Sequence, residues 1–122
     1  LIRTNNVSVS TKTIEEMEKK LEYLTDRQRD WFKPYLYYEK ALLEFQKLNY
    51  EGALDLLHFT IENYSAELDI VLGNAFLLQG MSYDKLYKRS KAKESYYNCI
   101  YLDNFSGSIN QAKLYLKRPY SD

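Results

Sequence analysis

The side chains that most often serve as nucleophiles or transition-metal ligands, histidine and cysteine, each occur once. His58 is the only histidine and Cys99 the only cysteine. One copy of the chain therefore cannot form a two-histidine metal site or a disulfide. A Cys/His nucleophile would need the two side chains to meet, whereas the helical spacing around Cys99 favours burial. We interpret both as structural or surface residues and predict no catalytic residue, no metal site and no cofactor.

Acidic residues and glycines do not group into a recognisable site either. Acidic pairs such as Glu15 with Glu16 and Glu67 with Asp69 fall at expected helix starts, where carboxylates stabilise the positive end of the helix dipole. The four glycines are scattered along the chain instead of forming a phosphate-binding loop. These observations predict that the chain is not an enzyme.

Five basic residues gather near one expected turn. A phosphate or acidic-peptide site is one interpretation of this cluster, and a solvated charged face is the other. Over the whole chain, 17 basic and 17 acidic residues cancel to a formal charge of zero, so no overall field attracts nucleic acid or anionic lipid. We expect no nucleic-acid partner. The cluster consists of Lys85, Lys88, Arg89, Lys91 and Lys93.

The composition of the 122 residues indicates an all-α protein. Four glycines and two prolines provide few of the tight turns that an all-β fold needs, whereas 45% of the residues are hydrophobic. No apolar run reaches the roughly 18 residues of a membrane helix, so we expect no membrane insertion. The single cysteine favours a reducing compartment such as the cytoplasm. Because the chain starts at Leu1 instead of methionine, we expect it to be part of a longer protein.

Residues 1–12 differ from the rest of the chain. They are polar, rich in Ser, Thr and Asn, and lack a helical pattern, so we expect a linker or extended lead-in. Thr13 and Glu16 then match a capping box, in which each side chain accepts a backbone N–H of the other residue. The first helix is expected to begin there.

From Thr13 onward, apolar residues recur at three- and four-residue intervals, which predicts amphipathic helices. Thr25 with Gln28 matches the capping box of a second helix, but a first helix that continues to Trp31 is an open alternative. Pro34 suits a helix's first turn and kinks a helix interior. Later helices are expected at residues 34–48, 50–63, 65–87 with Ser65 as the N-cap, 90–103 and 106–117.

The most informative spacing lies within residues 76–104. Small residues and aromatic residues recur there at fixed intervals along two expected helices. Together they resemble a tetratricopeptide repeat. Gly80, Tyr83, Ala92 and Tyr96 match the family pattern. Four positions depart from it, since the family usually has Trp, Leu, Ala and Pro where this chain has Phe76, Gln79, Cys99 and Asn104.

The physical basis of this pattern is close helix packing. Two helices approach only where a side chain is tiny, so Gly80 and Ala92 would let their backbones meet while Tyr83 and Tyr96 fill the flanking space. A weaker copy precedes it, and its Ala53 lies further from Ala92 than the roughly 34 residues of the family period.

The resemblance implies a right-handed solenoid of antiparallel helical hairpins. We expect repeats at about 35–68 and 73–106 within one helical domain, residues 13–122, with flanking helices before and after. Generic helical hairpins with an alanine at the crossing are the competing interpretation. In this family the first helices of the repeats line a concave groove that binds peptides or helices of partner proteins. A protein–protein interaction module is therefore the expected function.

The repeat register assigns nine residues to this groove. They mix apolar side chains with both charge signs, which favours a peptide of mixed character. Leu77 and Met81 occupy positions where the family's carboxylate clamp needs polar residues, which argues against a receptor for chaperone tails. The expected groove residues are Glu39, Leu43, Gln46, Lys47, Asn74, Leu77, Met81, Asp84 and Lys85.

An alternative function is oligomerisation or regulation within a larger multidomain protein. The groove would then be filled by the chain itself or by a second copy, as in a homodimer. Leu43, Leu77 and Met81, which we expect to be exposed, would form the core of that interface.

Overall fold

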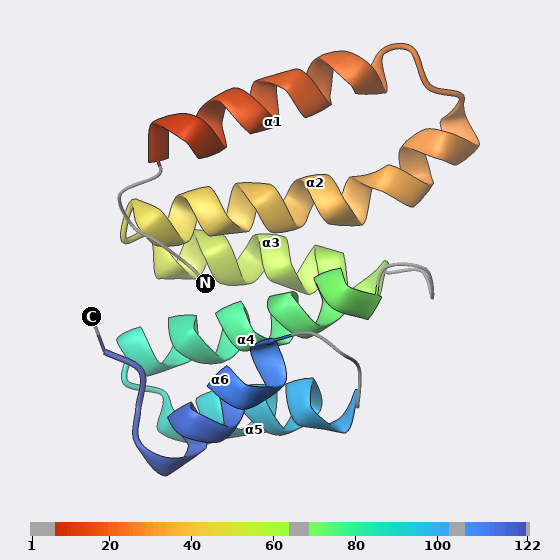
Figure 1. Cartoon of the computed structure of the whole chain (residues 1–122). Helices are drawn as coiled ribbons and strands as arrows, with labels where there is room; N and C mark the ends of the chain where they lie inside the picture. The colour runs from red at the N-terminus through yellow and green to blue at the C-terminus, as the bar shows by residue number, and fades with distance from the viewer. Residues whose placement is uncertain (1–6, 64–68, 103–106, 122) are drawn as a thin grey trace. The chain divides into compact units, whose positions relative to one another are not determined.

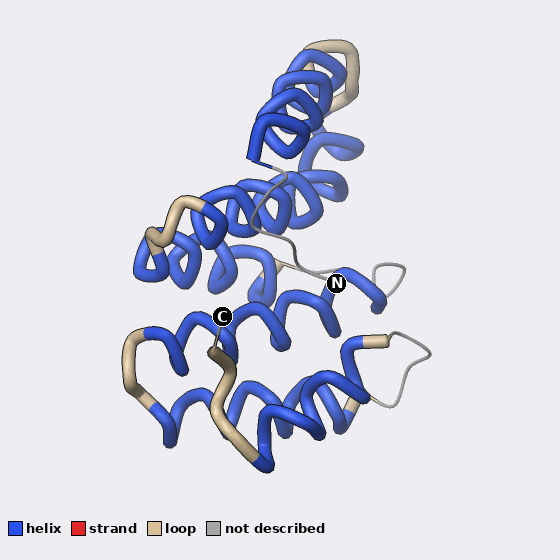
Figure 2. Tube along the Cα trace, turned by 60° about the vertical axis from the view of Figure 1, so that its left-hand side comes forward, coloured by secondary structure: helices blue, strands red, loops and turns tan. Residues whose placement is uncertain are grey.

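Every regular element of the chain is an α-helix in the ranges that can be described. A computed structural model describes residues 7–63, 69–102 and 107–121 (Figures 1 and 2). The predicted all-α class is confirmed for these residues, and no helix among them has the length and apolar character to cross a membrane. The helices are α1 (Val7–Leu21), α2 (Asp26–Gln46), α3 (Tyr50–Glu62), α4 (Asp69–Lys85), α5 (Arg89–Tyr101) and α6 (Ser108–Lys117).

The helices group into two compact units, residues 1–65 and residues 66–122. In the first unit α2 packs against both α1 and α3. In the second unit α5 packs against α4 and α6, and α4 also contacts α6. Short connections make α1, α2 and α3 antiparallel neighbours, as they do for α4 and α5 (Figure 1).

Helix α1 begins earlier than the sequence indicated. It starts at Val7 instead of near Thr13, so residues 7–12 are helical and Thr13 lies inside the helix instead of capping it. Packing explains the difference: Ile14 and Met17 join an apolar cluster with α2. Once one turn is held by tertiary contacts, helix extension outweighs the weak local propensities of the preceding Ser and Thr residues.

The capping box at Thr25 is confirmed. The backbone N–H of Gln28 donates to Thr25 Oγ1 at 3.2 Å, and the N–H of Thr25 donates to Gln28 Oε1 at 3.0 Å. Helix α2 therefore begins at Asp26, and Pro34 lies in its interior. Proline lacks an N–H and disturbs the preceding turn, and α2 bends in its first half (Figure 1). The Pro34 carbonyl accepts a hydrogen bond from the buried Thr60 hydroxyl at 3.0 Å, which ties α3 to this point.

The α2–α3 and α4–α5 turns have the same local structure. Each contains a residue with positive φ, Leu48 (69°) in the first and Tyr87 (60°) in the second. In each turn the next residue donates its N–H to a carbonyl near the end of the preceding helix, at 2.8 and 2.9 Å. This bond satisfies a carbonyl that the helix end leaves unpaired. The two hairpins thus end their first helix in the same way.

Gly80 sets the approach of α4 to α5, as the spacing predicts. A Cβ built on Gly80 would overlap the ring of Tyr96, and Tyr96, Ala92 and Cys99 are fully buried. The small side chains at 80 and 92 therefore leave the space that Tyr96 fills.

Several expected features fall on the segments that are not described. The expected N-cap Ser65, the exit residue Asn104 and the ends of both expected repeats, near 68 and 106, lie outside the described residues. The last helix, expected from 106, is described from Ser108 to Lys117.

We expect Gly80→Ala to lower the free energy of unfolding by about 1–3 kcal/mol, because the Tyr96 ring must shift to admit a methyl group. This is a net loss, because we expect the overlap with the ring to cost more than the roughly 1 kcal/mol that alanine gains over glycine in a helix. Urea denaturation followed by circular dichroism measures the change. Gly107→Ala is the control, since a Cβ there meets nothing within 4 Å and should change stability by less than about 0.5 kcal/mol. Equal stability of the two variants would contradict the packing role of Gly80.

Candidate functional site

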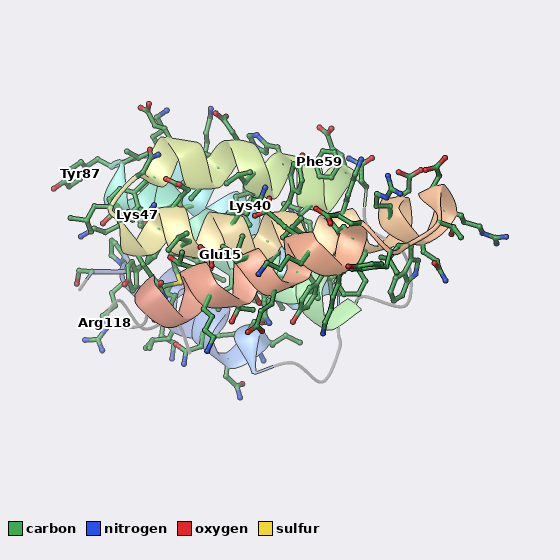
Figure 3. All side chains as sticks on the ribbon, turned by 90° about the horizontal axis from the view of Figure 1, so that it is seen from above. Glu15, Lys40, Lys47, Phe59, Tyr87 and Arg118 are labelled. Atoms are coloured by element: carbon green, nitrogen blue, oxygen red, sulfur yellow. The ribbon has the colours of Figure 1, made fainter. Side chains whose placement is uncertain are left out.

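The expected groove face of α2 is covered by α1 at Leu43. Figure 3, which views the chain from above, shows α1 lying over α2. Leu43 is half-buried and packs against the cluster formed by Ile14, Met17 and Leu36. The expectation that Leu43 is an exposed anchor is therefore wrong, because the first helix uses the same apolar stripe for its own packing.

The polar groove residues of α2 differ in exposure. Lys47 is exposed at the end of the helix (Figure 3). Gln46 is buried, and Glu39 is half-buried. Burial raises the pKa of Glu39 above its usual range. The neighbouring Lys40 places its Nζ 3.3 Å from Glu18 Oε2 of α1, which adds an ion pair to the α1–α2 contact.

In α4 the structure buries the expected apolar anchors. Leu77 is 8% and Met81 is 3% exposed, so the expectation that they are exposed is wrong. Helical periodicity identified the face on which they lie but could not identify what covers it. Asn74 and Lys85 are half-buried on the same helix. Asp84, expected in the groove, is buried and has a more specific role.

Asp84 is the centre of a buried hydrogen-bond network in the second unit. Its side chain is only 1% exposed. Both carboxylate oxygens accept from Arg89 Nη1, at 3.1 Å to Oδ1 and 2.9 Å to Oδ2. Oδ2 also accepts from the Tyr96 hydroxyl at 2.7 Å and from the backbone N–H of Tyr120 at 2.9 Å. The buried negative charge is thus paired and hydrogen-bonded, as a buried charge must be.

Arg89 connects this carboxylate to the end of α6. Its Nη2 donates to the backbone oxygens of Tyr115 at 2.6 Å and Leu116 at 3.0 Å. These carbonyls belong to the last turn of α6, where helix geometry leaves carbonyls without partners, and a cation suits that end of the dipole. One guanidinium therefore pairs with Asp84 and caps α6.

Tyr96 and Gln79 complete the polar interior between α4 and α5. Burial, together with the hydrogen bond to Asp84, raises the pKa of Tyr96 well above its usual range, so the phenol remains a donor. Gln79 stands where the family pattern has leucine, and its Oε1 accepts from the Ser95 hydroxyl at 2.8 Å in a buried pair. The departure from the pattern is thus compensated by a partner on α5.

His58 and Cys99 lie in different units. His58 is exposed on α3. Cys99 is fully buried, and burial raises the pKa of its thiol while a hydrogen bond with Ser108 lowers it. A thiol in this environment is a poor nucleophile, because the thiolate is the reactive form. Among the described residues, no group of three or more His, Cys, Asp or Glu side chains is placed to hold a metal ion.

The basic cluster does not present five cations on one surface. Arg89 turns inward to Asp84. Lys91 lies over the Tyr83 ring, with its Nζ 5.8 Å from the centroid. Lys88 and Lys93 are exposed. The exposure of Lys88 and Lys93 fits either interpretation of the cluster, whereas Arg89 is structural.

Sequence reasoning missed the role of Tyr120. The helical pattern ends before Pro119, and nothing in local spacing pairs Tyr120 with a residue of α4. The one available signal was the Pro119-Tyr120 step itself, because proline ends the helix and an aromatic residue after it has to pack elsewhere or remain exposed.

We expect Asp84→Asn to destabilise the second unit by about 3 kcal/mol, because it leaves the partly buried Arg89 without a counter-ion. Chemical denaturation with urea, followed by circular dichroism, measures this loss. Glu94→Gln is the matched control, since Glu94 is exposed on α5 and its neutralisation should change stability by less than about 0.5 kcal/mol. Similar stabilities for the two variants would show that the charge at Asp84 is not what holds the network.

No protein-family model, curated protein or solved structure matches this chain. The resemblance to tetratricopeptide repeats therefore depends on the residues of the chain itself.

Proposed function

We propose that the chain is a protein–protein interaction module that binds a peptide or helix of a partner. The observation that carries this proposal is the contact between Asp84 and Tyr120. A residue assigned to the groove by the repeat register accepts the backbone N–H of a segment that has left the helical fold, at 2.9 Å. Main-chain hydrogen bonds of this kind supply affinity in many peptide-binding proteins.

The proposal includes a tetratricopeptide-like arrangement of the hairpins. The close approach at Gly80, filled by the Tyr96 ring, and the identical turns at Leu48 and Tyr87 support it. The proposed site does not require Leu43, Leu77 or Met81 to be exposed. Instead it is centred on the C-terminal end of α4, at Asp84 and the neighbouring Lys85.

A selection of random peptides against the immobilised chain tests this function. We expect enriched peptides whose affinity, measured by fluorescence anisotropy, falls about tenfold in Lys85→Glu, because the substitution reverses a charge beside the site. Lys113→Glu reverses an exposed charge on α6 and should leave the affinity unchanged. Failure to enrich any binder, or equal loss in both variants, would count against a peptide site at the end of α4.

A second candidate function, self-association, is favoured by an aromatic pair on α5. The rings of Tyr97 and Tyr101 stack with centroids 6.0 Å apart and an interplanar angle of 19°, and both side chains are exposed. Aromatic rings grouped on one helix face are typical of interfaces, and a two-fold dimer would bury the same pair from each copy.

Sedimentation equilibrium over a roughly hundredfold range of concentration tests self-association. If the α5 pair forms an interface, we expect a dimer that Tyr101→Lys disperses, because a lysine ammonium is costly to desolvate at an interface core. Tyr23→Lys is the control, since Tyr23 is 86% exposed in the segment before α2, and should leave the mass unchanged. A monomer at every concentration would exclude this candidate and favour a heterologous partner.

A further inference from the structure

The chain after α6 lies against the second unit as an extended segment, here called the C-terminal strap, residues 118–121. Arg118 has extended backbone angles, φ −151° and ψ 142°. Arg118, Pro119 and Ser121 are exposed, whereas Tyr120 is half-buried. Arg118 projects away from the protein (Figure 3). The attachment of the strap is therefore centred on Tyr120.

Two contacts of Tyr120 differ in kind. Its backbone N–H donates to Asp84 Oδ2 at 2.9 Å. Its ring packs edge-on against Tyr115 of α6, with centroids 5.3 Å apart and an interplanar angle of 78°. The first contact recognises any residue that has an N–H, and the second requires an aromatic side chain.

Most contacts of the site do not involve the strap. Asp84 keeps its ion pair with Arg89 and its hydrogen bond from Tyr96, so its buried charge stays paired. Arg89 continues to hold the end of α6 through the Tyr115 and Leu116 carbonyls. The Tyr115 ring also packs against Tyr96, with centroids 5.7 Å apart. Release of the strap therefore avoids the large cost of an unpaired buried carboxylate.

We propose that the C-terminal strap is a displaceable intramolecular ligand, and that an extended partner segment with an aromatic residue directly after proline takes its place. This inference rests on the proposed function and names the class of peptide that the site binds. Proline disfavours a helical conformation in the residue before it and so favours an extended approach. The next N–H reaches Asp84, and the aromatic ring packs on Tyr115. The strap belongs to the same chain as the site, so it competes with the partner and inhibits its binding.

The competition follows from effective concentration. A segment tethered directly to α6 meets its site at an effective concentration in the millimolar range. A partner segment in trans therefore binds the wild-type chain more weakly than its own contacts would allow. Weakening the strap without altering the site should raise the affinity for the partner.

Fluorescence anisotropy with a labelled peptide tests this inference. The probe has the sequence of residues 117–122, Lys-Arg-Pro-Tyr-Ser-Asp, and is titrated with the wild-type chain and with Tyr120→Gly. We expect Tyr120→Gly to bind the probe about tenfold more tightly or better, because the variant strap lacks the ring that competes for Tyr115. Equal affinity of the two chains, or no binding to a Tyr120→Gly chain whose circular dichroism is unchanged, would overturn the proposal.

Two altered probes separate the contacts without any change to the protein's fold. A probe with N-methyltyrosine keeps the ring but lacks the N–H that Asp84 accepts, and a probe with alanine in place of tyrosine keeps the N–H but lacks the ring. Both are expected to lose at least about tenfold in affinity for Tyr120→Gly. Full affinity of the N-methylated probe would show that Asp84 does not recognise the segment, and would contradict the inference.

The peptide selection and the probe titration together distinguish a failure of this inference from a failure of the proposed function. If random selection against both chains yields binders sensitive to Lys85→Glu but the tail probe does not bind, the inference about the strap is wrong and the interaction module stands. If the probe with the sequence of residues 117–122 binds as expected but selection yields no peptide, the strap is displaceable and the proposed binding of other proteins is wrong.

Discussion

The second unit depends on one constraint, which is that a buried carboxylate has to be paired. Removing an unpartnered charge from water costs more than a small domain's marginal stability can offset. Asp84 meets this requirement with donors from α5 and from the segment after α6. Because Arg89 also holds the last carbonyls of α6, pairing this charge fixes the positions of three helices relative to one another.

The pairing in turn depends on a glycine. The Tyr96 ring lies where the Cβ of any other residue at position 80 would be, and its hydroxyl thereby reaches Asp84 at 2.7 Å. The lack of a side-chain carbon at Gly80 thus has two effects. It lets two helices approach, and it lets a long aromatic side chain carry a hydrogen-bond donor to a buried charge.

Local patterns in the sequence predicted the features that depend on neighbours along one helix or one turn. The capping box at Thr25, the helix over Tyr50–Glu62 and the packing at Gly80 are of this kind. The start of α1 at Val7 was not predictable from its polar residues, because contacts of Ile14 and Met17 with α2 stabilise the helix from outside. The burial of Leu77 and Met81 was also not predictable, because periodicity identifies a face of a helix but not what packs against that face.

The candidate site shows the limit of local reasoning most clearly. The repeat register assigned Asp84 to a groove, whereas the structure buries its side chain. Its partner Tyr120 is 36 residues away in sequence, and no periodicity connects them. A carboxylate that holds four hydrogen bonds from three residues can lose the tail's bond and still be neutralised by Arg89, whereas it cannot lose Arg89 without leaving a buried charge unpaired. The same network therefore contains a part that supports the fold and a part that, in our proposal, exchanges with a partner.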